Sequence, residues 1–382
     1  MISRIALTAA AGLLLGAAMV PARAADLGGG CCADLEERVA ELEATTARKG
    51  NRVVTLSVYG TVAKGLLVWD NGDQSDAYVV DNDAITSIMG FKGEATMKPG
   101  VKAGFNIELY IGDSNSGLVS QDNDEGDPGI FIRKSFVYIE SEKFGRVSIG
   151  QQSTAADGVS QVTLGNTLYV ASPDHSFSLE VGGAGGITLG EFANDFDGDR
   201  NDVVRYDSPS IYGFILSAAW GDDDYYDIAL RFAKEWNSIK IAAAVGYQNA
   251  DAADLGEFEA LTGSISVMHV PTGLFAALML GEKELESGAD ADFWYVQAGL
   301  ERKWFDYGAT TLYGEYGKYN DVATLTRTVD SSEAERFGFG VVQHFDSAAM
   351  DLFAQATFWN FELEGAEEED MSTLMVGAKI DF

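Results

Sequence analysis

The chain has 382 residues, of which 46% are hydrophobic and 22% charged. This balance excludes both a disordered chain and a bundle of membrane helices. The formal net charge of −33 excludes nucleic acid as a partner, because phosphate groups would be repelled. The 43 glycines, 15 tyrosines and 21 phenylalanines against 6 prolines are typical of a protein made largely of strands.

The first predicted element is a secretory signal peptide over residues 1–24. Arg4 supplies a positive charge, residues 5–20 are apolar, and Ala22 and Ala24 give the small-x-small pattern of a cleavage site. An N-terminal membrane anchor is the alternative, but the apolar stretch is short for one. No other stretch approaches the ~18 apolar residues of a transmembrane helix. The exported chain is therefore expected to be either soluble or a β-barrel.

Residues 25–52 are predicted to form a periplasmic leader with one short helix. Apolar residues recur on one face over residues 34–43, and Asp34 is placed to cap the start. A solvated leader and a small trimerising helix both fit this short pattern. The only two cysteines, Cys31 and Cys32, are adjacent and so cannot staple distant parts of the fold. Cross-linking of two chains through them is a further hypothesis.

From residue 53 to residue 382 the sequence alternates with a period of two. The last segment is the clearest, because Leu374, Val376 and Ile380 alternate with polar or small residues. The alternation predicts sixteen strands, an even number as in single-chain bacterial barrels. They are expected at residues 53–69, 84–95, 98–112, 130–141, 144–151, 200–209, 213–221, 225–236, 238–249, 257–270, 273–282, 291–304, 308–319, 334–346, 349–361 and 371–382.

Two irregularities accompany this pattern. Lys64 falls on the face that Val58 and Val62 share, and a β-bulge is expected in the first strand to correct this. Long acidic links, such as residues 70–83, are expected to alternate with short ones.

The alternation alone fits both a soluble sandwich and a membrane barrel. The face opposite the apolar one carries charges, which the core of a sandwich would not tolerate. Trp294 and Trp304 share the apolar face and lie ~33 Å apart along a strand. At a tilt of ~45° this projects to ~23 Å, close to the apolar band of outer-membrane barrels. The sequence therefore predicts an all-β fold, a sixteen-stranded antiparallel transmembrane β-barrel over residues 53–382.

One long segment, residues 152–199, lacks sustained strand alternation. It holds four clustered glycines between Gly182 and Gly186 and many acidic residues. A structureless segment of this length in a compact domain indicates either a functional loop or a misassigned element. We expect it to fold into the barrel and to set the width of a water-filled hole.

Several runs of the chain resemble one known family. They are Cys31-Cys32-Ala33-Asp34-Leu35-Glu36-Glu37-Arg38-Val39-Ala40-Glu41-Leu42-Glu43 followed by Ser57-Val58-Tyr59-Gly60, Phe144-Gly145-Arg146-Val147-Ser148-Ile149-Gly150-Gln151-Gln152, Arg205-Tyr206-Asp207-Ser208-Pro209, and the terminal Phe382. Together they are similar to porins from the outer membrane of alphaproteobacteria, and the likeness spans essentially the whole mature chain. The resemblance implies a sixteen-stranded barrel, usually a homotrimer, through which small hydrophilic solutes and ions diffuse.

The resemblance also implies partners and a constriction. Phe382 resembles the C-terminal aromatic signal that the outer-membrane insertion machinery reads, and outer-membrane lipid and lipopolysaccharide would surround the barrel. In this family the long loop after the strand that ends Ile149-Gly150-Gln151 folds inward, which places residues 152–199 in the lumen. The expected constriction residues are the acids Asp157, Asp174 and Glu180 and, on the opposite wall, the bases Arg133, Arg205 and Arg231.

The inward direction of these arginines depends on their neighbours in the strands. Arg133 points inward if Phe136 and Tyr138 face lipid, and Arg205 does so if Val204 and Tyr206 face lipid. Opposed charges across a narrow lumen would favour small polar solutes. The overall acidity predicts a preference for cations. A substrate-selective channel and a non-conducting structural or adhesive barrel are the alternatives.

Catalysis and bound cofactors are not expected. The three histidines, His175, His269 and His344, lack metal-type spacing, and no phosphate loop or dinucleotide motif occurs. Residues 195–199 are acidic but lack the glycine and glutamate that an EF-hand requires. Ca²⁺ at acidic loops, bridging to lipopolysaccharide phosphates, is the one ion site that the sequence suggests.

Overall fold

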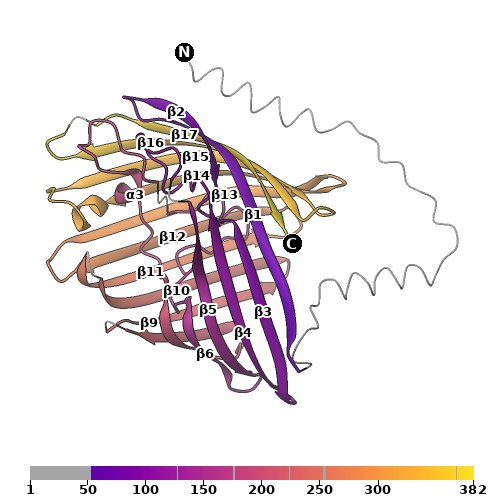
Figure 1. Cartoon of the computed structure of the whole chain (residues 1–382). Helices are drawn as coiled ribbons and strands as arrows, with labels where there is room; N and C mark the ends of the chain where they lie inside the picture. The colour runs from indigo at the N-terminus through magenta and orange to yellow at the C-terminus, as the bar shows by residue number, and fades with distance from the viewer. Residues whose placement is uncertain (1–52, 127, 175–176, 223, 253–254, 367) are drawn as a thin grey trace.

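The computed structural model describes residues 53–126, 128–174, 177–222, 224–252, 255–366 and 368–382 (Figure 1). The predicted signal peptide, the leader with its short helix, and both cysteines lie outside the described residues. Among the residues described, no helix has the length and apolar character needed to cross a membrane.

Strands make up most of the described chain, as the period-two alternation predicts. They are β1 Thr55–Asp70, β2 Ser75–Asp81, β3 Ile88–Lys98, β4 Val101–Gly112, β5 Gly129–Ser141, β6 Gly145–Ser153, β7 Arg200–Asp207, β8 Phe214–Gly221, β9 Tyr226–Trp236, β10 Ile239–Ala252, β11 Gly256–His269, β12 Leu274–Leu285, β13 Asp290–Phe305, β14 Gly308–Asn320, β15 Ser332–Phe345, β16 Met350–Leu363 and β17 Met371–Asp381. The short helices are α3 Leu189–Phe192 and η1 Val322–Leu325.

These strands form one closed antiparallel barrel. Each of β3 to β17 pairs with the next strand in sequence, and β17 returns to β1 through pairs from Thr61↔Asp381 to Asp70↔Ser372. β3 pairs with the first half of β1 and completes the circuit of sixteen strands. Figure 1 shows the strands running around the barrel from β1 to β17. The predicted sixteen-stranded transmembrane β-barrel is confirmed.

The region between β1 and β3 differs from the prediction. The expected loop at residues 70–83 contains strand β2, which pairs with the upper half of β1, and β3 begins only at Ile88. Residues 82–87 interrupt this part of the wall. The bulge expected in β1 is wrong, since the pairing runs through Lys64 without a shift. Instead the Lys64 ammonium lies 3.7 Å from Asp81 and 3.5 Å from Asp113, which offsets its charge on the outer face.

The outer face is apolar, as a surface against lipid requires. Val137 and Ile139 of β5 are exposed, and so are Trp294 and Trp304 of β13. The long connections all lie at the end of the barrel where β1 ends. The short turns lie at the other end, together with Phe382, whose backbone pairs with Gly60. Long loops are extracellular and short turns periplasmic in such barrels, which gives the chain its orientation.

A hydrophobic core lies inside the barrel on one side of the lumen. The connection between β6 and β7 contributes buried Leu179, Val181 and Phe192. They pack with inward side chains of the strands, and the rings of Phe192 and Phe361 lie 4.9 Å apart. Thr188 begins α3 with a capping box, in which the Glu191 carboxylate accepts the Thr188 N–H. One side of the lumen is therefore filled by folded chain, and the open path lies beside it.

Candidate functional site

The constriction loop, residues 154–199, is fixed to the inner wall by polar side chains that point inward from successive strands. Asp227 of β9 accepts the Ala156 N–H at 2.6 Å, and Ser266 of β11 accepts the Leu164 N–H at 3.0 Å. Gln297 of β13 accepts the Thr167 hydroxyl at 2.6 Å. The alternation predicts which polar side chains of the strands point inward. It does not predict their partners, because the loop is far from these strands in the sequence.

A buried ion pair holds the middle of the constriction loop. Arg336 of β15 and Glu315 of β14 are both fully buried and lie 2.5 Å apart. Arg336 also donates to the Ser172 carbonyl at 2.7 Å. A buried guanidinium is stable only with such partners, so the pair ties the loop to two strands. The sequence shows only that Arg336 is opposite the apolar face.

Residues 82–87, which separate β2 from β3, form a second inward segment. Asn82 donates to the Tyr169 carbonyl of the constriction loop at 2.9 Å. Asn115 donates to the Asp83 carboxylate at 2.8 Å. Burial raises the pKa of Asp83, and hydrogen bonding from Asn115 partly offsets this. The sequence alternation does not reveal this segment, because it predicts one continuous strand over residues 84–95.

Two cavities make up the open path. One, here the inner chamber, has a volume of about 430 Å³ and is lined by residues 82–86, the constriction loop and strands β5, β7, β16 and β17. The other, here the periplasmic vestibule, has about 750 Å³ and is lined by turn residues such as Asp346. Gln161, Leu168 and Tyr169 line both spaces. These three residues therefore mark the junction of the two spaces.

Charges of both signs line the inner chamber. Among the described residues, the acids are Asp83, Asp157, Asp174, Asp195, Asp197 and Asp199, and the bases are Arg133 and Arg200. The acids come from the constriction loop and the segment at residues 82–87, whereas the bases come from the barrel wall. Of the predicted constriction residues, Asp157, Asp174 and Arg133 line this chamber.

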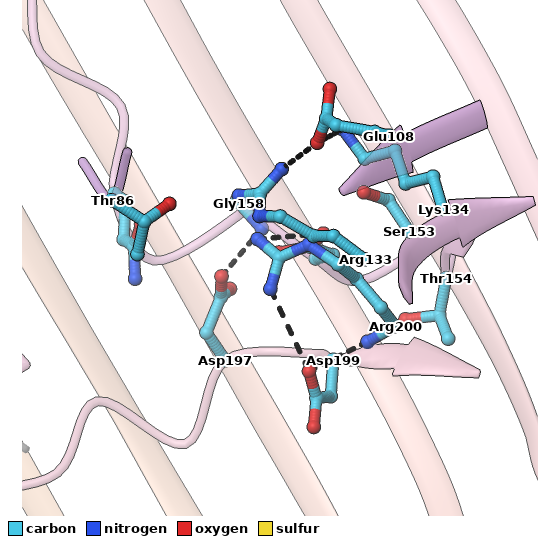
Figure 2. A network of polar contacts seen from close by, with 12 residues as sticks. Thr86, Glu108, Arg133, Lys134, Ser153, Thr154, Gly158, Asp197, Asp199 and Arg200 are labelled. Atoms are coloured by element: carbon cyan, nitrogen blue, oxygen red, sulfur yellow. Dashed lines mark hydrogen bonds and ion pairs between the residues drawn. The ribbon is translucent and has the colours of Figure 1, made fainter. Parts of the chain in front are cut away.

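The basic wall is organised by Glu108 of β4 (Figure 2). Glu108 is buried and pairs with Arg133, and the Lys134 ammonium lies 3.4 Å from the same carboxylate. Tyr59 of β1 donates to its other oxygen at 2.8 Å. Figure 2 also shows Arg200 close to Asp199, and their charged groups are 3.8 Å apart. Arg133 and Arg200 thus present their guanidinium groups to the chamber.

Arg133 points inward for a different reason from the one predicted. Val137 and Ile139 are the exposed residues of this strand, so Phe136 and Tyr138 face the lumen and the expectation that they face lipid is wrong. The register between β4 and β5 shifts next to Glu108, and Arg133 is the residue without a partner. This β-bulge turns Arg133 and Lys134 to the same side. Sequence alternation cannot show where such a bulge occurs.

The other predicted basic residues hold the start of the constriction loop. Arg205 pairs with Asp207 at 2.7 Å and donates to the carbonyls of Ser153 and Thr154. Val204 and Tyr206 beside it are exposed as expected. Arg231 donates to the Asp157 carbonyl at 2.7 Å. Both arginines point inward but bind the loop backbone, and neither lines the inner chamber.

The predicted acids lie in two places. Asp157 and Asp174 line the inner chamber, and the Asp157 carboxylate lies 3.9 Å from Arg200. Glu180 is exposed near the extracellular end, where its backbone bonds with Asn71 and Gln121. It does not line the inner chamber. The roles of these residues in permeation stay predictions.

Asp197 and Asp195 shape the turn that begins the constriction loop. The Asp197 carboxylate accepts the consecutive N–H groups of Gly158, Val159 and Ser160. Asp195 accepts from Ser160 and Gln161, both at 2.8 Å. Burial raises the pKa of both acids, and for Asp197 the neighbouring charges of Asp195 and Asp157 raise it further. The sequence shows that acidic residues cluster in residues 195–199, but it does not show their role.

An apolar outer face, sixteen closed strands and a charged, water-filled interior define a β-barrel channel of the outer membrane. A sequence model of the Gram-negative porin family matches residues 6–362. The chain belongs to this family, and it is a multi-pass outer-membrane protein that forms a diffusion channel. No curated protein matches the chain.

Solved structures with the same fold are similar over most of the chain. The anion-selective porin from Comamonas acidovorans is 18% identical, covers 86% of this chain and 100% of its own, and gives a TM-score of 0.59. OmpT of Vibrio cholerae in its trimer form is 15% identical, with 86% and 100% covered and a TM-score of 0.58. The Salmonella typhi OmpF complex with daunomycin is 14% identical, with 87% and 99% covered and a TM-score of 0.59. At these identities the likeness supports the fold.

Proposed function

We propose that this porin passes small hydrophilic solutes and ions passively and prefers cations. The observation that carries the proposal is the charge of the open path. Six carboxylates face two guanidinium groups among the described residues lining the inner chamber. In the vestibule, Glu301, Asp346, Asp351 and Asp381 face Lys379. Rings of carboxylates favour cations in channels.

The fold does not fix the sign of this preference, since a similar structure is that of an anion-selective porin. The sign must come from the lining residues. Planar bilayers with a tenfold KCl gradient provide the test, because the sign of the reversal potential reports which ion crosses more readily. We expect the sign of reversal potential that corresponds to a higher permeability for K⁺ than for Cl⁻. A reversal potential of the opposite sign would contradict the cation preference, and folded protein without conductance would favour the non-conducting barrel.

A substrate-selective channel is the second candidate, supported by the size of the inner chamber. Its volume of about 430 Å³ lies within the range of ~300–1,000 Å³ found for small-molecule sites. A solute that binds there would block the ion current in a saturable way. Conductance that stays unchanged over millimolar concentrations of amino acids, sugars and organic acids would favour general diffusion.

We propose a homotrimer as the assembled form, with outer-membrane lipid and lipopolysaccharide around it. OmpT of Vibrio cholerae, which shares the fold, has been solved in a trimer form. Light scattering of the detergent-solubilised protein, corrected for bound detergent, tests this assembly. A mass of one chain, 40.9 kDa, would contradict it. Insertion through recognition of Phe382 is a linked proposal, and a Phe382→Ala variant that reaches the outer membrane normally would argue against it.

Ca²⁺ at the acidic loops also stays a proposal. Within the described ranges, no group of three or more histidine, cysteine or acidic residues is arranged to hold a metal ion. A bridging site would therefore need lipopolysaccharide phosphates as additional ligands. Calorimetry with millimolar Ca²⁺, with and without lipopolysaccharide, separates these cases. Heat in neither titration would dispose of the proposal.

A further inference from the structure

Tyr169 occupies a special position in the constriction loop, because it lies at the junction of the inner chamber and the vestibule. It is 8% exposed. Its carbonyl is bound by Asn82 on one side of the path. On the other side its ring packs edge-on against Phe353, with centroids 5.9 Å apart. The placement of this side chain therefore affects the passage between the two spaces.

The Tyr169 hydroxyl is held by a cluster of ionisable residues in the vestibule wall. It donates to one oxygen of Asp351 at 3.0 Å. The other oxygen of Asp351 lies 2.6 Å from Nδ1 of His344. The Lys379 ammonium is 3.4 Å from Asp351 and 5.2 Å from the centre of the Tyr169 ring. One carboxylate thus connects the constriction loop with strands β15, β16 and β17.

We propose that His344 is a pH-sensing residue of this channel and that it acts on Tyr169 through the positioning residue Asp351. The inference rests on the proposed channel function and adds a regulation of the same path. Because the vestibule is at the end of the short turns, the pH that it senses is that of the periplasm.

The chemistry of His344 follows from its partner. A carboxylate only accepts hydrogen bonds, so Nδ1 of the neutral imidazole must carry the hydrogen. Protonation then adds a charge without breaking this bond. Unperturbed histidine titrates near pH ~6.5, within the range that a periplasm experiences. One positive charge therefore appears beside the junction when the pH falls.

This charge has two consequences. It opposes the negative charge of Asp351 and of Glu301, Asp346 and Asp381, which share the vestibule with Lys379, so the attraction for cations decreases. It also draws the Asp351 charge toward the imidazolium, which weakens the carboxylate as an acceptor for the Tyr169 hydroxyl. The hydrogen bond from Tyr169 to Asp351, which holds the constriction loop, is therefore weaker at acidic pH.

Thermodynamic linkage makes the second consequence measurable. If protonation of His344 weakens the bond from Tyr169, then removal of that bond must make protonation easier by the same factor. The variant Tyr169→Phe should consequently titrate at higher pH than the wild type. A purely structural role of Tyr169 would not shift a titration midpoint.

The test measures the cation-to-anion permeability ratio in planar bilayers from pH 8 to pH 5, with the same pH on both sides. We expect the ratio to fall on the order of twofold in the wild type between pH 8 and pH 5. In His344→Gln this fall in the permeability ratio should be absent. In Tyr169→Phe its midpoint should lie about half a pH unit higher than in the wild type. The contribution of His344 is the difference between the wild-type and His344→Gln pH profiles, because Asp195 and Asp197 also titrate.

His269→Gln is the matched control, since His269 is an exposed residue at the end of β11 that contacts Thr272. It should keep the wild-type step, and so should His175→Gln. A flat wild-type profile, a step that persists in His344→Gln, or an unchanged midpoint in Tyr169→Phe would each overturn the inference while leaving a conducting porin. Absence of any conductance would instead contradict the proposed function.

Discussion

At the scale of single residues, Glu108 determines how the basic wall is presented. Its carboxylate holds Arg133 and Lys134 and is itself bound by Tyr59. Without it, two cations would lie close together with no anion between them. One buried acid thus permits the guanidinium group of Arg133 to face the inner chamber without strong repulsion from Lys134.

Glu108→Gln tests this role. The amide removes a negative charge but keeps the shape, so the chamber gains one positive charge and the cation preference should fall. Stability should drop by about 1–3 kcal/mol, because a buried charged hydrogen-bond partner is lost. Reversal potentials and urea unfolding in lipid vesicles measure the two effects. Lys102→Gln is the control, since Lys102 is an exposed residue that pairs with Glu94 and lines neither the inner chamber nor the vestibule. A selectivity unaffected by Glu108→Gln would refute the role of this acid.

Asp197 is the second residue with a specific consequence. Its pKa lies well above the ordinary 3.8 because of burial and the nearby Asp195 and Asp157. An acid with a raised pKa takes up its proton at higher pH than a free carboxyl group. The negative charge of the inner chamber therefore begins to decrease at a pH above that at which free carboxyl groups titrate, and the cation preference decreases with it.

Asp197→Asn should remove this part of the pH dependence. The expected result is a cation preference that is lower than wild type at pH 8 and that falls less as the pH is lowered toward the ordinary carboxyl range. Current recordings across a salt gradient at several pH values provide the measurement. Asp222→Asn, in a loop at the extracellular end, is the control. Equal pH dependence in Asp197→Asn and the wild type would show that Asp197 does not contribute.

At the scale of elements, the constriction loop is a packed part of the fold as well as an obstruction. It buries apolar side chains against the wall and is bound by Arg336, Gln297 and Asp227. A flexible flap would have few such contacts. We infer that the loop and the barrel stabilise each other.

Deletion of residues 163–186 should affect both conductance and stability. The filled side of the lumen would open, so single-channel conductance should rise by at least about twofold. Loss of buried residues such as Leu179 and Val181 should cost about 1.5–3 kcal/mol each and lower the unfolding temperature. Single-channel recordings and thermal unfolding in detergent measure these changes. Gln297→Ala, which removes a single wall side chain bonded to Thr163, Thr167 and Ala171 of the loop, is the comparison. Unchanged conductance in the deletion would place the loop outside the path.

At the scale of the whole molecule, the net charge of −33 is distributed over loops, rim and lumen. Only charges close to the path select ions, because salt screens the others. The screening length is ~10 Å at 0.1 M salt and ~3 Å at 1 M. The cation preference should therefore weaken as salt concentration rises.

Reversal potentials at a fixed tenfold gradient but different mean KCl concentration test this dependence. We expect a cation-to-anion ratio that decreases steadily between 0.1 M and 1 M salt. The Glu108→Gln variant, with a weaker field at the inner chamber, should show a smaller change over the same range. A ratio independent of salt would mean that size, and not charge, controls passage.

The sequence alone determined the architecture of this protein. A period of two repeated over residues 53–382 places apolar residues such as Val376 and Ile380 on one face, and this depends only on local geometry. The absence of such alternation in residues 152–199 identified the loop that folds into the barrel.

The tertiary structure determined the features that local geometry cannot predict. The bulge at Arg133, the inward segment at residues 82–87 and the tie from Tyr169 through Asp351 to His344 join residues that are far apart in the chain. Alternation shows on which face of a strand a side chain lies, but not which loop reaches it. In a barrel, closure brings distant strands and a long loop into one lumen, so the charges that meet there are set by the whole fold.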